Sequence, residues 1–219
     1  MSNDAIELLS KIVFPELIKT LYMVLVAVVF STFFGFILAI ILTVTDKNGL
    51  KPNKYIYQVL DTVINIVRSF PFIILIVAII PLTRFIVGTS IGEKAAIVPL
   101  TIAASPFIAR LIEGTLKEVD RGLIEAARSF GASDMQIIFK IMIKEAIPSI
   151  ISVITLAVVS ILGATAMAGA VGGGGLGAIA LTYGYQSFNE TVMYGTVFVL
   201  IIIVQIIQLS GDFLYRKLR

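Results

Sequence analysis

The chain has 219 residues and a formal net charge of +3, with 58% hydrophobic and only 14% charged residues, whereas an average soluble domain has about 25% charged residues. This composition indicates a protein that folds in lipid, and the low net charge argues against a nucleic-acid partner. The chain contains no Cys and no His, which excludes disulfide bonds, a Cys nucleophile, a His base and the usual zinc and haem sites.

Five stretches are apolar and long enough to cross a membrane, because a bilayer core about 30 Å thick requires about 20 residues of helix. The spans are predicted at residues 17–45, 57–84, 94–113, 148–170 and 191–213, and a cytoplasmic segment at 114–147. The predicted fold class is therefore an all-α polytopic membrane protein, in which residues 1–219 form a single transmembrane domain.

Lys and Arg residues predict the orientation, since cytoplasmic loops are enriched in them. Five spans place the two termini on opposite sides of the membrane. One side carries Lys47, Lys51, Lys54, Arg110, Lys117, Arg121, Arg128, Lys140, Lys144, Arg216, Lys217 and Arg219. The other side carries only Lys11, Lys19, Arg84 and Lys94. The N-terminus is predicted outside the cell and the C-terminus in the cytoplasm.

Arg68 is the one charged residue between Thr62 and Thr83. An ionisable residue within a span is a candidate for function, but a long Arg side chain near the end of a span also reaches back to the membrane surface. Pro71 is expected to break the helix and to free backbone carbonyls for Arg68. The favoured role is an anchor at the cytoplasmic interface, with a part in transport as the alternative.

The cytoplasmic segment has apolar residues at helical spacing, which predicts two short amphipathic helices. These residues are Leu123, Ala126, Ala127 and Phe130, followed by Met135, Ile138, Phe139 and Met142. Gly131 can end the first helix, and Ser133 or Asp134 can cap the second. Such an element either lies on lipid headgroups beneath its own bundle or docks in a groove of a partner protein.

Residues 146–189 carry no charge and are too many for one span, so their glycine-rich second part is expected to form a loop or a re-entrant element. Small residues allow helices to pack closely within one chain, or they line a pore between two copies of the chain. Met167 is the one long side chain among Gly163–Ala170, and its thioether can act as a movable plug or as packing. The pore or gate candidates are Met167, Gly169, Gly172 and Gly173.

The glycine-rich stretch is not a phosphate-binding loop, because no Lys followed by Ser or Thr comes after it. No catalytic residue, metal site or cofactor site is therefore predicted in this chain. Tyr183, Tyr185, Gln186 and Asn189 follow on the outer side. They are expected either to meet an extracytoplasmic solute-binding protein or to form an aromatic belt at the membrane surface.

Glu125-Ala126-Ala127, followed after three residues by Gly131, resembles the EAA motif of bacterial ABC-importer permeases. Ile141 stands at the expected place in the tail of that motif, whereas Ile143 and Lys144 replace its Leu and Pro. Longer strings resemble the MetI-type permeases of methionine importers. These strings are residues 68–75, 80–84, 169–177 and 183–185, and the likeness extends over almost the whole chain.

The resemblance implies a type I ABC-importer permease in the bacterial plasma membrane that moves methionine by alternating access. It implies a homodimer, two cytoplasmic ATPase subunits that bind ATP and Mg²⁺, and an extracytoplasmic substrate-binding lipoprotein. The implied ATPase-coupling residues are Leu123, Glu125, Ala126, Ala127, Phe130, Gly131, Ala132 and Ser133.

The sequence leaves three other functions open. The first is a permease of the same class whose substrate is another polar amino acid or a small peptide. Alternatively, the chain is a non-transporting membrane scaffold whose cytoplasmic helices recruit a regulator. A secondary transporter is the third, although such proteins normally use ionisable groups or broken-helix ion sites near the membrane midplane, and this chain offers few.

Overall fold

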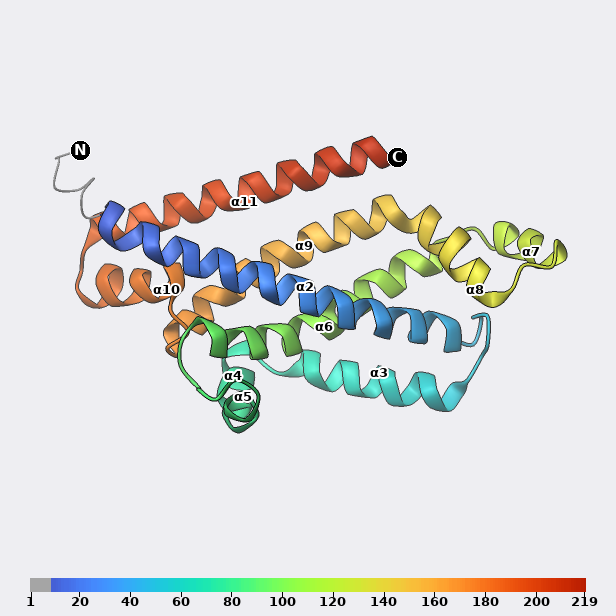
Figure 1. The fold of residues 1–219 in the computed structure, drawn as a ribbon, viewed down its shortest axis with the longest axis horizontal. Coiled ribbons are helices and arrows are strands. Elements are labelled where there is room, and N and C mark those ends of the chain that lie inside the picture. Colours follow the sequence, from blue (N-terminus) through green and yellow to red (C-terminus); the bar gives the residue numbers. More distant parts are fainter. Residues whose placement is uncertain (1–8) are drawn as a thin grey trace.

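A computed structural model describes residues 9–219, and these residues form helices and connecting turns without any strand. The long helices run roughly along the long axis of the molecule (Figure 1). The helices in chain order are η1 (Leu9–Val13), α2 (Phe14–Thr45), α3 (Lys54–Ser69), α4 (Phe72–Ala78), α5 (Ile80–Val87), α6 (Glu93–Lys117), α7 (Arg121–Ser129), α8 (Asp134–Gln136), η2 (Ile137–Met142), α9 (Ile143–Ala170), α10 (Gly175–Ile179), η3 (Ala180–Gln186) and α11 (Glu190–Leu218).

The predicted all-helical membrane fold is confirmed. Within residues 9–219, four helical runs are long and apolar enough to cross a membrane: Ser10–Thr45, Glu93–Lys117, Asp134–Ala170 and Glu190–Leu218. A fifth crossing arises when α3 and α4 are taken as one broken span. The prediction for the N-terminus itself falls on residues 1–8 and so lies outside the described part of the chain.

The second span, predicted over 57–84, is broken at Pro71, as the sequence indicated. α3 ends at Ser69, the next two residues are extended, and α4 leaves at an angle of 103°. Pro71 explains the break, because proline has no N–H for the helix and disfavours the helical conformation in the residue before it. Phe70 accordingly has φ −76° and ψ 128°.

The sequence predicted a second short helix after Gly131, but α8 is not a separate helix. It continues through the π-helical turn η2 into α9, so Asp134–Ala170 is one helical run of 37 residues. The segment predicted to be cytoplasmic is therefore one independent helix, α7, followed by a corner and the N-terminal extension of the fourth span. α7 and α8 protrude together at one end of the molecule (Figure 1).

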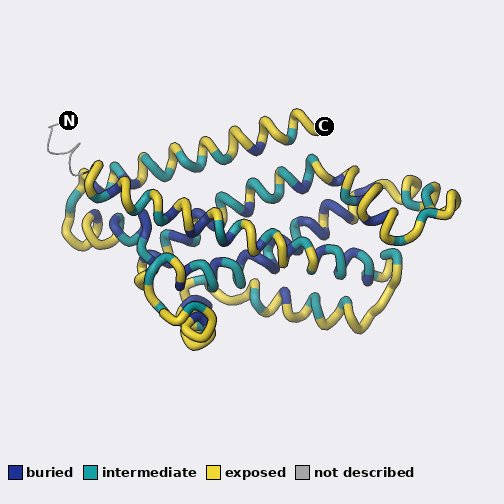
Figure 2. The backbone as a smooth tube through the Cα atoms, viewed as in Figure 1, coloured by how far each residue is buried: buried dark blue, intermediate teal, exposed yellow. Residues whose placement is uncertain are grey.

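The core lies where α2, α6 and α9 meet, and α6 is the most enclosed of these helices. In its most apolar window, 56% of α6 is buried, against 11% for α11. Buried residues accordingly follow the central helices, while α3 and α11 are largely exposed (Figure 2). Gly35 permits the close approach of α2 to α6, because a Cβ there would lie 2.8 Å from the side chain of Ile108.

The glycine-rich stretch folds back as α10 and η3 against the end of α9. A Cβ on Gly169 would lie 2.5 Å from the backbone nitrogen of Ala178, and one on Gly177 would lie 2.3 Å from the Cα of Ala166. Only glycine lets two backbones come this close. The expected loop or re-entrant element is therefore a tightly packed helical hairpin within one chain.

Candidate coupling and translocation sites

The corner after α7 is built by backbone hydrogen bonds around a left-handed residue. Asp120 caps the start of α7 by accepting the Gly122 N–H at 2.7 Å. At the other end Gly131 has φ 78°. The Ala132 N–H donates to the Ala127 carbonyl at 3.0 Å, and the Gly131 N–H donates to that of Arg128 at 2.9 Å. These two bonds form a Schellman motif, which ends a helix where the sequence predicted.

The second half of the corner is held by side chains. Ser133 and Gln136 form a capping box, in which each side chain accepts from the other residue's backbone N–H. Asp134 lies 3.3 Å from the Lys51 ammonium and 3.8 Å from the Arg128 guanidinium, and Arg128 also donates to the Leu50 carbonyl at 3.0 Å. The corner is therefore tied to the loop between α2 and α3.

The eight predicted coupling residues divide into two sets. Ala127 and Ala132 pack, together with Ile124, against the core cluster beneath them. The remaining six face away from the bundle and are exposed: Leu123, Glu125, Ala126, Phe130, Gly131 and Ser133. Phe130 is 91% exposed at the tip. An apolar surface with a protruding aromatic ring on a rigid corner has the form of a docking element.

A cluster of charges lies at the end of α6, just before α7, and no pattern in the sequence indicated it. Glu113 on α6 has a side chain only 4% exposed. Its carboxylate accepts from Arg110 at 2.8 Å and from the Tyr57 hydroxyl at 3.2 Å, and it lies 2.7 Å from the Lys117 ammonium. Arg110 also pairs with Asp61 of α3. The cluster joins α3 to α6 three residues before α7 begins.

Lys117 extends the cluster to the end of α2 by binding Asp46 at 2.9 Å. Burial alone would raise the pKa of the Asp46 carboxyl. The hydrogen bond from the Asn48 N–H and the ammonium of Lys117 outweigh burial, so that the pKa is lowered. A cavity of about 400 Å³ lies beside this pair, between the loop that follows α2 and α7.

Replacing Glu113 by Ala is expected to destabilise the protein strongly. The change would leave two cations without their shared carboxylate, and removing one partner of a buried ion pair costs about 3–5 kcal/mol. Denaturant unfolding of the purified protein in detergent measures this loss. Glu118→Ala is the matched control, since Glu118 is exposed and close by. An equal loss in both variants would contradict the role given to Glu113.

The four gate candidates do not share one surface. Met167 is 50% exposed on α9, and Gly172 is also exposed. Gly169 and Gly173 are buried, and a Cβ on Gly173 would lie 2.7 Å from the Ala168 carbonyl oxygen. Both glycines are enclosed by their own chain, and Gly173 also borders a small cavity next to the loop.

The first span holds the glycine-rich loop in place, which the sequence did not reveal. Glu16 accepts the Gly175 N–H at 2.7 Å, and the Thr20 hydroxyl accepts the Leu176 N–H at 2.8 Å. Two backbone donors at the start of α10 are thus satisfied by side chains of α2. Gly175 has φ 81°, and a Cβ there would lie 2.6 Å from the Thr20 hydroxyl oxygen.

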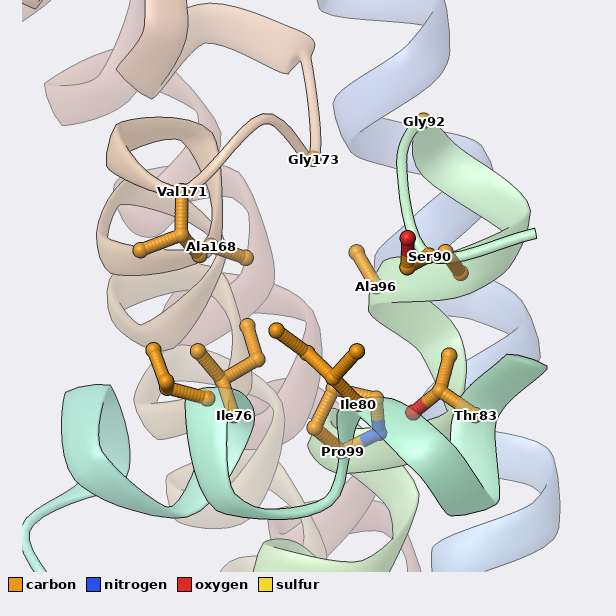
Figure 3. A pocket seen from close by; sticks show the side chains of 12 residues that line it. Ile76, Ile80, Thr83, Ser90, Gly92, Ala96, Pro99, Ala168, Val171 and Gly173 are labelled. Atoms are coloured by element: carbon orange, nitrogen blue, oxygen red, sulfur yellow. The ribbon is translucent and has the colours of Figure 1, made fainter.

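A small cavity separates this loop from the broken second span (Figure 3). Its volume is about 30 Å³, and Ile76, Ile80, Pro99 and Ala168 contribute apolar walls. The buried Thr83 hydroxyl has no hydrogen-bond partner in residues 9–219. The space suits one water molecule and excludes a larger solute.

Arg68 lies at the C-terminal end of α3. It is in the last turn of α3, at the end far from the loop 46–53 and from α7 (Figure 1). Its role as an anchor at a membrane surface stays a prediction. Of the residues predicted on the outer side, Tyr185 is 67% exposed, whereas Asn189 caps α11 by accepting the Val192 N–H.

Comparisons with known proteins agree with this architecture. The chain is 51% identical over 199 residues to the "Probable D-methionine transport system permease protein MetI" of Vibrio cholerae, covering 91% of this chain and 88% of that protein. It is 49% identical over 173 residues to the "Methionine import system permease protein MetP" of Bacillus subtilis, covering 78% of each. The structure "Inward facing conformations of the MetNI methionine ABC transporter" superposes with a TM-score of 0.93 at 44% identity, covering 100% of both chains.

A family comparison gives the same result. Residues 31–219 match the family described as "Binding-protein-dependent transport system inner membrane component". The match takes in four of the five predicted spans and the whole predicted segment 114–147, called the coupling segment below. The chain belongs to this family of inner membrane components of binding-protein-dependent transport systems.

Proposed function

We propose that the chain is the permease subunit of an ATP-driven importer that carries methionine across the inner membrane of a bacterium. The observation that carries this proposal is the superposition on a methionine ABC transporter over 100% of both chains at 44% identity. The names of the Vibrio cholerae and Bacillus subtilis relatives support the same substrate. In this role the chain is a transport component and not an enzyme.

The proposed assembly contains two copies of the chain, with the path between them. Two cytoplasmic ATPase subunits bind ATP and Mg²⁺, and each holds one coupling segment. A substrate-binding lipoprotein delivers methionine from the outer side. The proposed orientation, N-terminus outside and C-terminus inside, brings the start of α3, the coupling corner and the C-terminus to the cytoplasmic end of the molecule (Figure 1).

The coupling segment is suited to transmit movement because both of its ends continue into spans. α6 ends three residues before α7, and α8 continues into α9 without interruption. When ATP draws the two ATPase subunits together, the segments approach each other and both spans follow. The packed helices then change from an inward-open to an outward-open arrangement.

Met167 is the proposed gate. Its half-exposed side chain lies on a face of α9 with Gly163 and Ala170, one helical turn away on either side, and both are exposed. A flexible thioether among small residues can close a narrow passage and move aside. Gly172 borders the same end of α9, while Gly169 and Gly173 hold the loop behind it.

Uptake of labelled methionine in cells with and without the gene tests this function. Deletion is expected to lower uptake, and a plasmid copy to restore it. Excess unlabelled methionine should compete, whereas other polar amino acids and short peptides should not. Competition by one of these would identify a different substrate. Unchanged uptake, with the chain still bound to an ATPase, would identify a scaffold.

A further inference from the structure

α3 carries a polar strip along its length. Residues three and four apart on a helix share a face, and on α3 this spacing connects Lys54, Gln58, Asp61, Asn65 and Arg68. Within a membrane, such a strip faces protein or water.

The opposite face of α3 is apolar and exposed. It consists of Ile56, Val59, Val63 and Ile66. This face suits lipid. The third side of the helix packs on the bundle through the buried Ile64. The polar strip is therefore turned away from lipid but is covered by the chain's own helices only in part.

Asp61 and Asn65, in the middle of the strip, are paired within the chain. Arg110 binds Asp61 and donates to Asn65 at 3.3 Å, and Asn65 donates to Asp61 at 3.1 Å. Arg68 is exposed, as Asn65 is, but unlike Asn65 and Asp61 it forms no hydrogen bond or ion pair within residues 9–219. A guanidinium without a counter-charge requires water or an anionic ligand around it.

The position of Arg68 along the helix places it at membrane depth. At 1.5 Å per residue, it lies about 21 Å along the axis from Lys54 at the cytoplasmic start of α3. A bilayer core is about 30 Å thick. The guanidinium therefore lies well inside the membrane, at the point where Pro71 ends the helix and the chain turns by 103°.

We propose that Arg68 binds the carboxylate of the amino-acid substrate in a water-filled path along the polar strip of α3. The proposal rests on the import function proposed above. A guanidinium is always charged and offers two parallel N–H donors that match the two oxygens of a carboxylate. In this arrangement Arg68 supplies the positive charge that a zwitterion meets within the membrane.

A single-cysteine experiment tests the proposal, because the chain contains no native Cys. Arg68→Cys is introduced into the complete transporter, with its ATPase and binding protein, in membrane vesicles. The thiol is then treated with a water-soluble methanethiosulfonate that adds either an ammonium or a sulfonate group. Ile66→Cys is the matched control, two residues away on the apolar face, where its parent side chain is 53% exposed.

We expect the thiol at position 68 to react several-fold faster than the thiol at position 66. Methionine uptake by Arg68→Cys should fall several-fold, be largely restored by the ammonium reagent and stay low with the sulfonate reagent. Arg68→Lys should keep part of the uptake. ATP hydrolysis and the amount of assembled transporter should stay near those of the parent.

Several results would overturn the proposal. Equal uptake by Arg68→Gln and the parent, a thiol at position 68 that does not react, or equal rescue by both reagents would each exclude carboxylate binding. Loss of assembled transporter that neither reagent reverses would identify Arg68 as an anchor to lipid phosphate. In all these cases the parent still imports methionine. If the parent imports none, the proposed function itself is wrong.

Discussion

Phe130→Asp is expected to separate the permease from its ATPase while leaving the membrane bundle folded. The ring is 91% exposed at the tip of the coupling corner, so the bundle loses no packing when it is replaced. A partner groove that encloses an aromatic ring loses about 2 kcal/mol or more when the ring is removed, and a buried charge adds to this loss. Uptake should fall together with the amount of ATPase that co-purifies.

Phe130→Leu is the matched control, because it keeps an apolar side chain of similar size at the same place. It should retain most of the ATPase and most of the uptake. Thermal unfolding of the isolated permease should be the same for both variants and the parent. If the Phe130→Asp variant retained its full complement of ATPase, the corner would not be the docking element, and the proposed coupling mechanism would be wrong.

Gly177→Ala is expected to damage the fold although it adds a single methyl group. The new Cβ would lie 2.3 Å from the Cα of Ala166, and no rotamer change relieves a contact with backbone. Overpacking of a well-filled core costs about 1–3 kcal/mol, and here α10 must also move away from α9. Lower thermal stability in detergent and a lower yield of folded protein should result.

Gly163→Ala provides the comparison on the same pair of elements. Nothing lies within 4 Å of a Cβ at Gly163, and alanine favours a helix more than glycine does. Its stability should equal or slightly exceed that of the parent. If the two variants unfolded at the same temperature, the close contact of α9 and α10 would not be a major source of stability.

Local signals in the sequence predicted the local structure. Gly131 ends α7 in the left-handed conformation, and Ser133 begins the next helix with a capping box, because both effects depend on neighbours within a few residues. Pro71 likewise breaks the second span. The angle of that break could not be predicted from the sequence, because it depends on how α4 packs against other helices.

Contacts between distant residues account for what the sequence missed. Glu113 and Asp61 belong to different spans, and nothing in their spacing marks them as parts of one charge cluster. Gly169 and Gly173 were predicted to line a pore, but they are buried against their own chain. Small residues serve close packing and an open lining equally well, so composition alone does not separate the two roles.

The bond from the Gly175 N–H to Glu16 joins residues 159 positions apart. The first span therefore enters the membrane long before the ribosome has made the segment that its carboxylate will hold. In the folded protein Glu16 also pairs with Lys19 of the same helix at 2.6 Å. The hairpin of α9 and α10 is therefore fixed to α2 late in biogenesis, because Glu16 can bind the Gly175 N–H only after residue 175 has been made.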